Sequence, residues 1–347
     1  MSRVATPARL APVNIYTDPG YLDALAEVYF DGRDCQVRDH VVGGAVYRLL
    51  VVEGVGPVTR QTFLDLHEPL GAAARGARGL ARLPRLAGTA LDAMTLEACR
   101  QRPGWEDALG APTILWSGFA AWSDYLQLLR TRKVAAEDQR RGRRLRDLLG
   151  ELEFRVDDRA ADVLPTCYAW KSARDLELGR PDLFAVDANR RFFPALRARG
   201  LLRASTLRAS PQAGGGLLAV WLGAVYRGRW SGWIFSFNPD PAYAKFSPGR
   251  QLLYPMLEES HRSGHAEFDF SIGMEAYKLH FATHVRPIGL AGAPPPAARL
   301  AAAMKDCLRR SPWCYRQARA MRHWLVAAPP APHPGAATAA APGDAHP

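Results

Sequence analysis

Residues 230–252 read WSGWIFSFNPDPAYAKFSPGRQL, and this stretch decides which fold we expect. The aromatic and apolar residues 230–237 are typical of a strand that lines a core. After a junction, Ser247 is a residue type favoured at a helix N-cap, and Pro248 is pre-organised for the first helical position. Gly249 has no side chain that would obstruct a ligand. We therefore expect a strand, a junction and a helix that begins at Pro248.

The pattern on both sides of this stretch predicts further strands and helices. Strands are expected at 151–156, 201–207, 217–226, 230–237, 267–270 and 285–290, and helices at 160–179, 188–200, 248–263 and 274–281. Turn residues separate the three strands between 201 and 237, as they do in hairpins. This order of elements predicts an α/β (α+β) fold with a mixed central sheet that helices flank on both faces.

Fewer elements are expected before residue 151. A helix is predicted at 21–30 and strands at 47–52 and 114–116. An Arg-rich helix or helix pair is expected from about 120 to 149, and Gly150 fits its C-terminal end.

Composition and residue spacing exclude several classes of protein. With 48% apolar and 23% charged residues the chain is an ordinary globular protein. Long apolar segments are lacking, so we expect neither a transmembrane helix nor a secretory signal. The five cysteines and nine histidines form no CxxC or HExxH pattern, which predicts no disulfide framework and no metal site. We expect a cytoplasmic protein.

The net charge of +11 is concentrated in two basic clusters, at 130–146 and at 305–322. Such clusters can face an anionic partner such as a phosphate-bearing substrate, coenzyme A, tRNA or membrane headgroups. A solvated helix face has the same composition, and charge alone does not distinguish these interpretations.

The start of the helix at Pro248 has the chemistry of a phosphate site. A helix N-terminus directs backbone N–H groups and the positive end of its dipole outward. Lys245 and Arg250 flank it with full charges. An ordinary capped helix, with no phosphate site, would have the same sequence pattern. If phosphate binds here, a side chain at residue 249 would point into an empty site, so that Gly249→Asp would fold normally and lose binding.

Four spaced motifs support the interpretation of this helix start as a phosphate site. In chain order they are Trp170-Lys171-Ser172; Asn238-Pro239-x-x-x-Tyr243-x-x-Phe246-Ser247-Pro248-Gly249-x-x-Leu252; Gly264; and Phe268-Asp269-Phe270-x-x-Gly273-x-Glu275-x-Tyr277-Lys278. Together they resemble the CelD/BioF2-like acetyltransferases, a group of GNAT proteins related to the FemAB peptidoglycan aminoacyltransferases. The resemblance covers residues 114–290 and implies a GNAT fold, in tandem with a degenerate N-terminal GNAT-like half.

The resemblance also implies an acyl-CoA site, with acetyl-CoA as co-substrate and no metal. In that family the Ser-Pro-Gly turn occupies the pyrophosphate-binding position, and the Tyr-Lys pair lies near the acceptor channel. The strand at 230–237 would offer backbone N–H groups to the thioester and the pantetheine arm. The implied cofactor-binding residues are Phe235, Ser236, Phe237, Tyr243, Lys245, Phe246, Ser247, Pro248, Gly249, Arg250 and Leu252.

Acyl transfer to an amine needs a group that accepts the proton of the amine and groups that stabilise the oxyanion. Asp269 and Glu275 are the candidates for the general base, because a carboxylate in a desolvated cleft can have a raised pKa. Lys278 would pair with Glu275 or hold an anionic acceptor. Tyr277, or alternatively Tyr243, is a candidate acid toward the departing thiolate. A buried structural carboxylate and a solvated ion pair are the alternatives for Asp269 and for Glu275–Lys278.

Three functions agree with these residues. The first is an N-acyltransferase that moves an acyl group from acyl-CoA, acetyl-CoA or longer, to an amine of a sugar, peptide or other metabolite. The second is a FemAB-like transferase that takes aminoacyl-tRNA, with the basic segment 130–146 on the RNA backbone. The third is a non-catalytic GNAT-like protein in exopolysaccharide or cell-envelope assembly.

We expect the chain to divide into five segments. They are a degenerate GNAT-like half at 1–118, an Arg-rich helical connector at 119–150, the GNAT acyltransferase domain at 151–292, a basic helix at 293–326, and a disordered tail at 327–347.

Overall fold

The computed structural model describes residues 14–42, 45–59, 61–68, 70, 95–97, 110–132 and 134–290. These residues belong to the first of two compact units, Met1–Ala293; the second unit is Pro294–Pro347. The basic helix expected at 293–326 and the tail expected at 327–347 lie outside the described residues. None of the helices in the described ranges combines the length and apolar character needed to cross a lipid bilayer.

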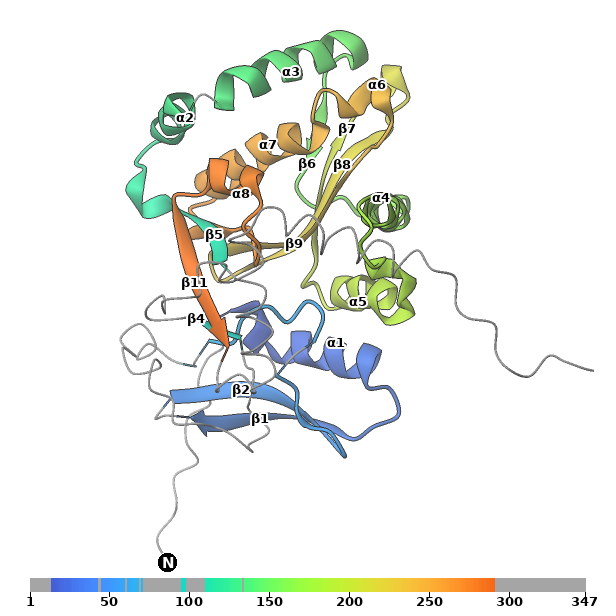
Figure 1. Ribbon diagram of the computed structural model, residues 1–347, viewed down its shortest axis with the longest axis vertical. Helices are drawn as coiled ribbons and strands as arrows, with labels where there is room; N and C mark the ends of the chain where they lie inside the picture. Colours follow the sequence, from blue (N-terminus) through green and yellow to red (C-terminus); the bar gives the residue numbers. More distant parts are fainter. Residues whose placement is uncertain are drawn as a thin grey trace, which may run out of the picture. The chain divides into compact units, whose positions relative to one another are not determined.

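A mixed sheet forms the centre of the first unit (Figure 1). Its strands are β4 (Thr95–Glu97), β5 (Gly110–Leu115), β6 (Glu153–Arg155), β7 (Arg203–Arg208), β8 (Leu217–Tyr226), β9 (Arg229–Phe237), β10 (Glu267–Asp269) and β11 (His284–Leu290). They are arranged in the order β4-β11-β5-β10-β9-β8-β7-β6. Strands β9 and β10 are parallel, and the other neighbours are antiparallel. The predicted mixed central sheet is confirmed.

Helices cover both faces of this sheet, as predicted. They are α1 (Pro19–Tyr29), α2 (Trp122–Thr131), α3 (Val134–Leu149), α4 (Val163–Glu177), α5 (Asp187–Ala198), α6 (Pro241–Ala244), α7 (Pro248–Arg262) and α8 (Ala276–Phe281). Short 3-10 turns lie at η1 (Ile15–Thr17), η4 (Trp116–Gly118), η5 (Leu183–Ala185) and η6 (Pro211–Ala213). The expected helix pair at 120–149 is α2 and α3, and Gly150 ends α3 with a φ of +72°.

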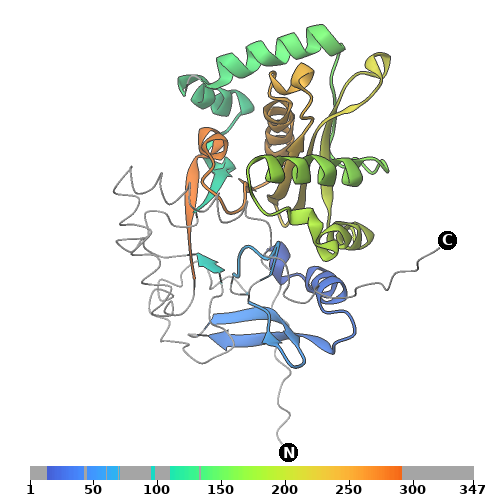
Figure 2. The same ribbon diagram turned by 45° about the vertical axis from the view of Figure 1, so that its right-hand side comes forward.

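Each face of the sheet packs into its own hydrophobic core. Helix α7 buries Leu253, Met256 and Leu257 against one face, and α2 and α3 pack on its outer side. Helices α1, α4 and α5 pack into the core on the other face, to which α5 contributes Phe192 and Phe193. Figures 1 and 2 show α7 between the sheet and α3. Helix α7 thereby presents its first turn at the end of β9.

The N-terminal part adds a second sheet and completes the first. Strands β1 (Cys35–Val42), β2 (Ala45–Val52) and β3 (Gly56–Pro57) form an antiparallel sheet against α1. Strand β5 instead lies inside the large sheet, between β11 and β10. The division expected at residue 118 therefore does not coincide with an edge of the large sheet. The tandem arrangement with a degenerate N-terminal half stays a prediction.

A bulge in β9 changes which face its side chains meet. Leu222 of β8 pairs with Ile234, but the next residue, Gly223, pairs with Gly232, so Trp233 is the extra residue. A Cβ at Gly223 would overlap with the backbone of Ser231, which explains why this position carries glycine. As a result Trp233 and Ile234 both face the core of α4 and α5, although they are consecutive in a strand.

Candidate functional site

Strands β9 and β10 run side by side and then separate. Their parallel pairing extends from Arg229 opposite Glu267 to Ser231 opposite Asp269. Beyond Ser231, β9 continues to Phe237 with β8 along one edge. In the described part of the chain, no strand pairs with its other edge at 233–237. Backbone N–H and C=O groups along such an edge are available to an extended ligand.

Helix α7 begins beside this open edge, with Ser247 at the predicted N-cap position and Pro248 as its first residue. Ser247 takes a left-handed conformation, with φ 55° and ψ 56°, and its side chain makes no capping hydrogen bond. Its Oγ accepts a hydrogen bond of 2.7 Å from Nη1 of Arg141 on α3. Ser247 is thus the N-cap residue, as predicted, but its hydroxyl is engaged by α3 and makes no capping hydrogen bond.

Gly249 has a packing role that differs from the one expected. Its position is buried, and a Cβ there would lie 2.9 Å from Cε1 of Phe235 and closer still to Cζ. A side chain at this residue would therefore meet an aromatic ring and not an empty site. The expectation that Gly249→Asp folds normally is wrong, because the close approach of α7 to β9 requires a glycine.

Two other residues expected to bind the cofactor are held within the protein. Leu252 is fully buried in the core of α7. Arg250 donates a hydrogen bond of 2.6 Å from Nη2 to Oδ2 of Asp138 on α3, so it does not stand free beside the helix start. Burial raises the pKa of Asp138, against the opposing effects of Arg250 and of a hydrogen bond from Tyr254.

The remaining expected donor residues surround the open edge and a groove next to it. Strand β9 holds Phe235 and Phe237 on the α7 side, with ring centroids 6.2 Å apart, and it buries Ser236. Helix α6 places Tyr243 against the same core. A groove of about 710 Å³ lies beyond them, and it is lined by Lys245 and Phe246 together with Glu137, Arg141, Arg144, Asp147 and Leu148 of α3. The basic segment of α3 and the turn before α7 thus form one groove.

Asp269 lies at the end of β10, where the two strands separate. Its Oδ1 accepts the backbone N–H of Ser271 at 2.8 Å, and its Oδ2 accepts a hydrogen bond from Arg286 at 3.0 Å. The carboxylate is buried, with both oxygens engaged. This arrangement is that of a buried structural carboxylate, which was the alternative to a general base for Asp269.

The residues expected on the short helix after β10 divide into a surface and a buried part. Glu275 is about half exposed, at 51%, and forms an ion pair of 3.0 Å with Lys278. Lys278 is buried and also donates to the backbone oxygen of Ile272 at 3.0 Å. Tyr277 faces Phe235 across the gap between β9 and α8, with ring centroids 5.7 Å apart. Burial and then Glu275 raise the pKa of Tyr277 well above its ordinary value, so its hydroxyl stays protonated.

A carboxylate that the sequence analysis did not single out lies where β9 and β10 separate. Asp65 comes from the segment after β3, and its Oδ2 accepts hydrogen bonds from the Ser271 hydroxyl and, at 3.4 Å, from Tyr16. Tyr16 in turn accepts a hydrogen bond of 2.9 Å from Nε1 of Trp233. No local motif marks Asp65, because its neighbours lie far from it in sequence.

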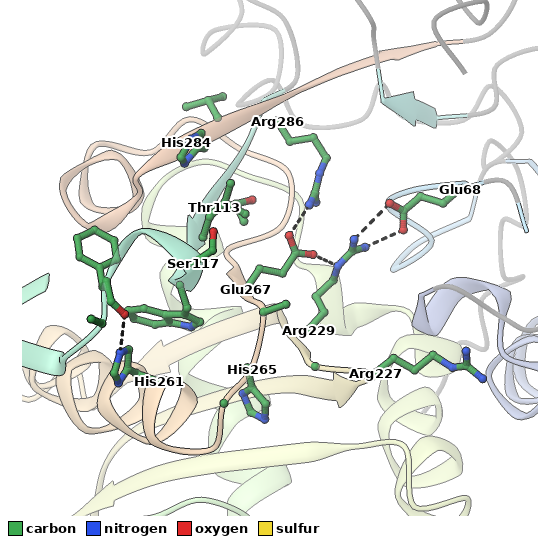
Figure 3. A pocket seen from close by; sticks show the side chains of 18 residues that line it. Glu68, Thr113, Ser117, Arg227, Arg229, His261, His265, Glu267, His284 and Arg286 are labelled. Carbon is green, nitrogen blue, oxygen red and sulfur yellow. Dashed lines mark hydrogen bonds and ion pairs between the residues drawn. The ribbon is translucent and has the colours of Figure 1, made fainter. Parts of the chain in front are cut away.

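A buried chain of charges lies at the opposite end of the same strands (Figure 3). Arg229 of β9 bridges Glu68 and Glu267, and Arg286 of β11 bridges Glu267 and Asp269. Burial works against the charge on Arg229, but the two glutamates raise its pKa above the ordinary value. All of these residues except Asp269 line a cavity of about 980 Å³, whose wall also carries His261, His265 and His284. The charge chain fixes the start of β9 and β10 and the segment that holds Glu68.

The cysteine on α4 is a core residue. Cys167 is fully buried, and burial raises the pKa of its thiol to about 12. A thiol with so high a pKa is a poor nucleophile.

Comparisons with known proteins agree with this geometry. Residues 132–279 match the sequence profile described as "Acetyltransferase (GNAT) domain". Among solved structures, the chain is similar to FemX, at 11% identity and a TM-score of 0.50, over 85% of this chain and 96% of FemX.

Two further solved structures have lower scores. L-PGS from Bacillus licheniformis has 12% identity and a TM-score of 0.42, over 86% of this chain and 98% of that one. A conserved protein of unknown function from Bacteroides thetaiotaomicron has 12% identity and a TM-score of 0.45, over 78% and 88%. A search among curated proteins finds no match. The matched region, with its mixed sheet and separating parallel strands, is similar to the acetyltransferase domains of the GNAT superfamily, and this similarity supports an acyltransferase enzyme.

Proposed function

We propose that this protein transfers an acyl group from acyl-CoA, acetyl-CoA or a longer thioester, to an amine of a sugar, peptide or other metabolite. The observation that carries the proposal is the open edge of β9 at 233–237, which leads from the point where β9 and β10 separate to the start of α7. An extended pantetheine arm fits such an edge, because it can exchange hydrogen bonds with an unpaired strand.

The groove beside α7 suits the phosphates of the donor. Lys245, Arg141 and Arg144 contribute three cations to its lining, against two carboxylates from Glu137 and Asp147. The positive end of the α7 dipole lies beside these cations. In this placement Phe246, Ser247 and Pro248 shape the turn that approaches the pyrophosphate. That turn is held in place by three residues that pack inside the protein, Gly249, Arg250 and Leu252.

The reaction proceeds by direct attack of the amine on the thioester carbonyl. A carbon–nitrogen bond forms, the oxyanion accepts hydrogen bonds from β9 backbone N–H groups, and the carbon–sulfur bond then breaks. Tyr277 lies beside Phe235 of β9 and remains protonated, so we assign it as the proton donor to the departing thiolate. Asp269 and Glu275 are each engaged in ion pairs, and we assign both, with Lys278, to positioning.

Calorimetric titration of the full chain with acetyl-CoA tests the donor. Arg144→Ala and Lys245→Ala should each weaken binding about tenfold, as expected for a lost hydrogen bond to a charged group. Arg159→Ala is the matched control, because Arg159 is 75% exposed and does not line the groove. Equal affinity of all four proteins for acetyl-CoA, or no binding by the wild type, would overturn the proposed donor site.

An aminoacyl-tRNA donor is the second candidate, and the outer face of α3 is the observation that favours it. Arg140, Arg143 and Arg146 are exposed on this helix, outside the groove lining. Contacts with an RNA backbone would make affinity fall steeply with salt, by a slope that counts the phosphates contacted. Retention of aminoacyl-tRNA with such a slope, and no binding of acetyl-CoA, would favour this candidate. Binding of neither donor would favour the non-catalytic one.

A further inference from the structure

The described residues contain a carboxylate that reaches the strand separation from outside the domain matched by the family profile. Asp65 precedes that domain by more than sixty residues, since the matched region begins at residue 132. Its hydrogen-bond partners nevertheless come from both sides of the gap. Ser271 follows the end of β10, and Tyr16 connects Asp65 to Trp233 on β9.

The bulge in β9 explains why Asp65 meets this point of the strand. It places Trp233 on the face of the sheet that α1, α4 and α5 cover, which is also the face that Tyr16 packs against. Phe235, two residues later, faces α7 on the opposite side. The side chains of β9 that follow the β9–β10 pairing thus face the Tyr16 and Asp65 side at Trp233 and the α7 side at Phe235.

The hydrogen bonds of Asp65 leave part of its carboxylate for a ligand. In the described ranges both of its hydrogen bonds go to Oδ2, and the residue is only partly buried. Asp269, by contrast, has both oxygens engaged, and the half-exposed Glu275 is paired with Lys278. Among these three carboxylates Asp65 has the geometry of a proton acceptor.

The groups around Asp65 also suit this task. Burial raises the pKa of Asp65; the Ser271 hydrogen bond opposes this, and the Asp269 carboxylate adds to it. Lys278 and the Tyr16 hydroxyl are further groups that lower the pKa, and Tyr21 is the other titratable side chain that senses this carboxylate. A carboxylate with a raised pKa is a stronger base than an ordinary one.

We propose that Asp65 is the general base of the transferase and that the acceptor amine approaches from the face of the sheet on which Tyr16 and Trp233 lie. This inference rests on the proposed acyl transfer. The amine nitrogen bonds to the thioester carbon while Asp65 takes a proton from that nitrogen. The carbon–sulfur bond then breaks, the thiolate is protonated, and Asp65 returns its proton to solvent. The base thus comes from the N-terminal part of the chain, and the donor site from the GNAT domain.

The test compares Asp65→Asn with the wild type in the release of coenzyme A thiol from acetyl-CoA. The nucleophiles are glucosamine, a lysine-containing tripeptide and water. The expected result is a fall in kcat of about 10²- to 10⁴-fold with unchanged calorimetric affinity for acetyl-CoA. The acidic limb of the wild-type pH profile, where activity falls as Asp65 is protonated, should be absent. Asp31→Asn, an exposed carboxylate of the same N-terminal part, is the control and should behave like the wild type.

A second variant keeps the inference testable if Asp65→Asn does not fold. Ser271→Ala removes a hydrogen bond that lowers the pKa of Asp65, so it should move the acidic limb to higher pH while activity at high pH survives. Wild-type rates in Asp65→Asn, or an unshifted limb in Ser271→Ala, would overturn the role of Asp65. If the wild type neither binds acetyl-CoA nor releases thiol, the result would instead overturn the proposed acyl transfer from acyl-CoA, on which this inference rests.

Discussion

Arg250 and Asp138 form an ion pair of 2.6 Å that ties the first turn of α7 to α3, and the carboxylate of Asp138 is fully buried. The pair holds together the two helices that form the proposed donor groove. Its loss should therefore affect both the stability of the fold and the affinity for the donor.

Arg250→Met should lower the free energy of unfolding by about 3–5 kcal/mol, because it leaves a buried carboxylate without its cation. The effect should shrink as the pH falls, since the native state of the variant binds a proton on Asp138 more tightly than the unfolded chain does. Urea unfolding between pH 5 and pH 8 would measure this. The double variant Asp138→Leu/Arg250→Met should recover most of the loss, and an equal loss in both variants would contradict the explanation.

Gly249→Ala should destabilise the protein by about 1–3 kcal/mol through overlap with the ring of Phe235. Phe235→Leu should relieve the overlap, so the double variant should lose less than the sum of the two single changes. Gly216→Ala is the control, because nothing lies within 4 Å of a Cβ at that exposed position. Additive losses in thermal unfolding would show that the two residues are not in contact.

Asp65→Asn should stabilise the fold near neutral pH, even though it should lower kcat. The raised pKa means that the native state binds the Asp65 proton more tightly than the unfolded chain. Ionisation of Asp65 therefore costs wild-type stability as the pH rises from the ordinary carboxyl value through the raised one. The advantage of the variant should appear over this range and vanish in more acidic solution. A variant that is less stable than the wild type at pH 7 would contradict the raised pKa.

Glu275→Gln should change the free energy of unfolding by less than about 1 kcal/mol and leave kcat within a few fold, because the Glu275 side chain is half exposed and Lys278 keeps its hydrogen bond to Ile272. Lys278→Met should act more strongly, since Lys278 is buried and also holds the backbone of Ile272. The expected signature is a raised KM for the acceptor at similar affinity for acetyl-CoA. A hundredfold loss of kcat in Glu275→Gln would return this residue to the role of base.

The elements that the sequence predicted well are those that depend on local periodicity. Strands β7, β8 and β9 and helix α7 lie within one or two residues of their expected bounds, because apolar spacing and turn residues specify them locally. The strand predicted at 114–116 exists as β5, but its place between β11 and β10 depends on residues about 150 positions away. No local pattern encodes such a pairing.

The site was predicted in part for the same reason. Lys245, Phe246 and Ser247 lie at the groove because one contiguous motif carries them. The hydrogen bonds of Ser247 with Arg141 and of Arg250 with Asp138 were not predicted, because these partners lie on α3, across the fold. Asp65 was not predicted as a site residue. Its environment is formed by Tyr16 and Ser271, which contact it only in the folded structure.

The position of β5 also determines the order in which the protein can assemble. Its two neighbours, β10 and β11, are made at least 150 residues later during synthesis, and the loop between them must close before either ladder forms. Until then β5 offers two unpaired edges of buried, apolar backbone to other chains. Strand β5 is thus the element of the large sheet that a nascent chain must protect from aggregation, for as long as the sheet has not closed.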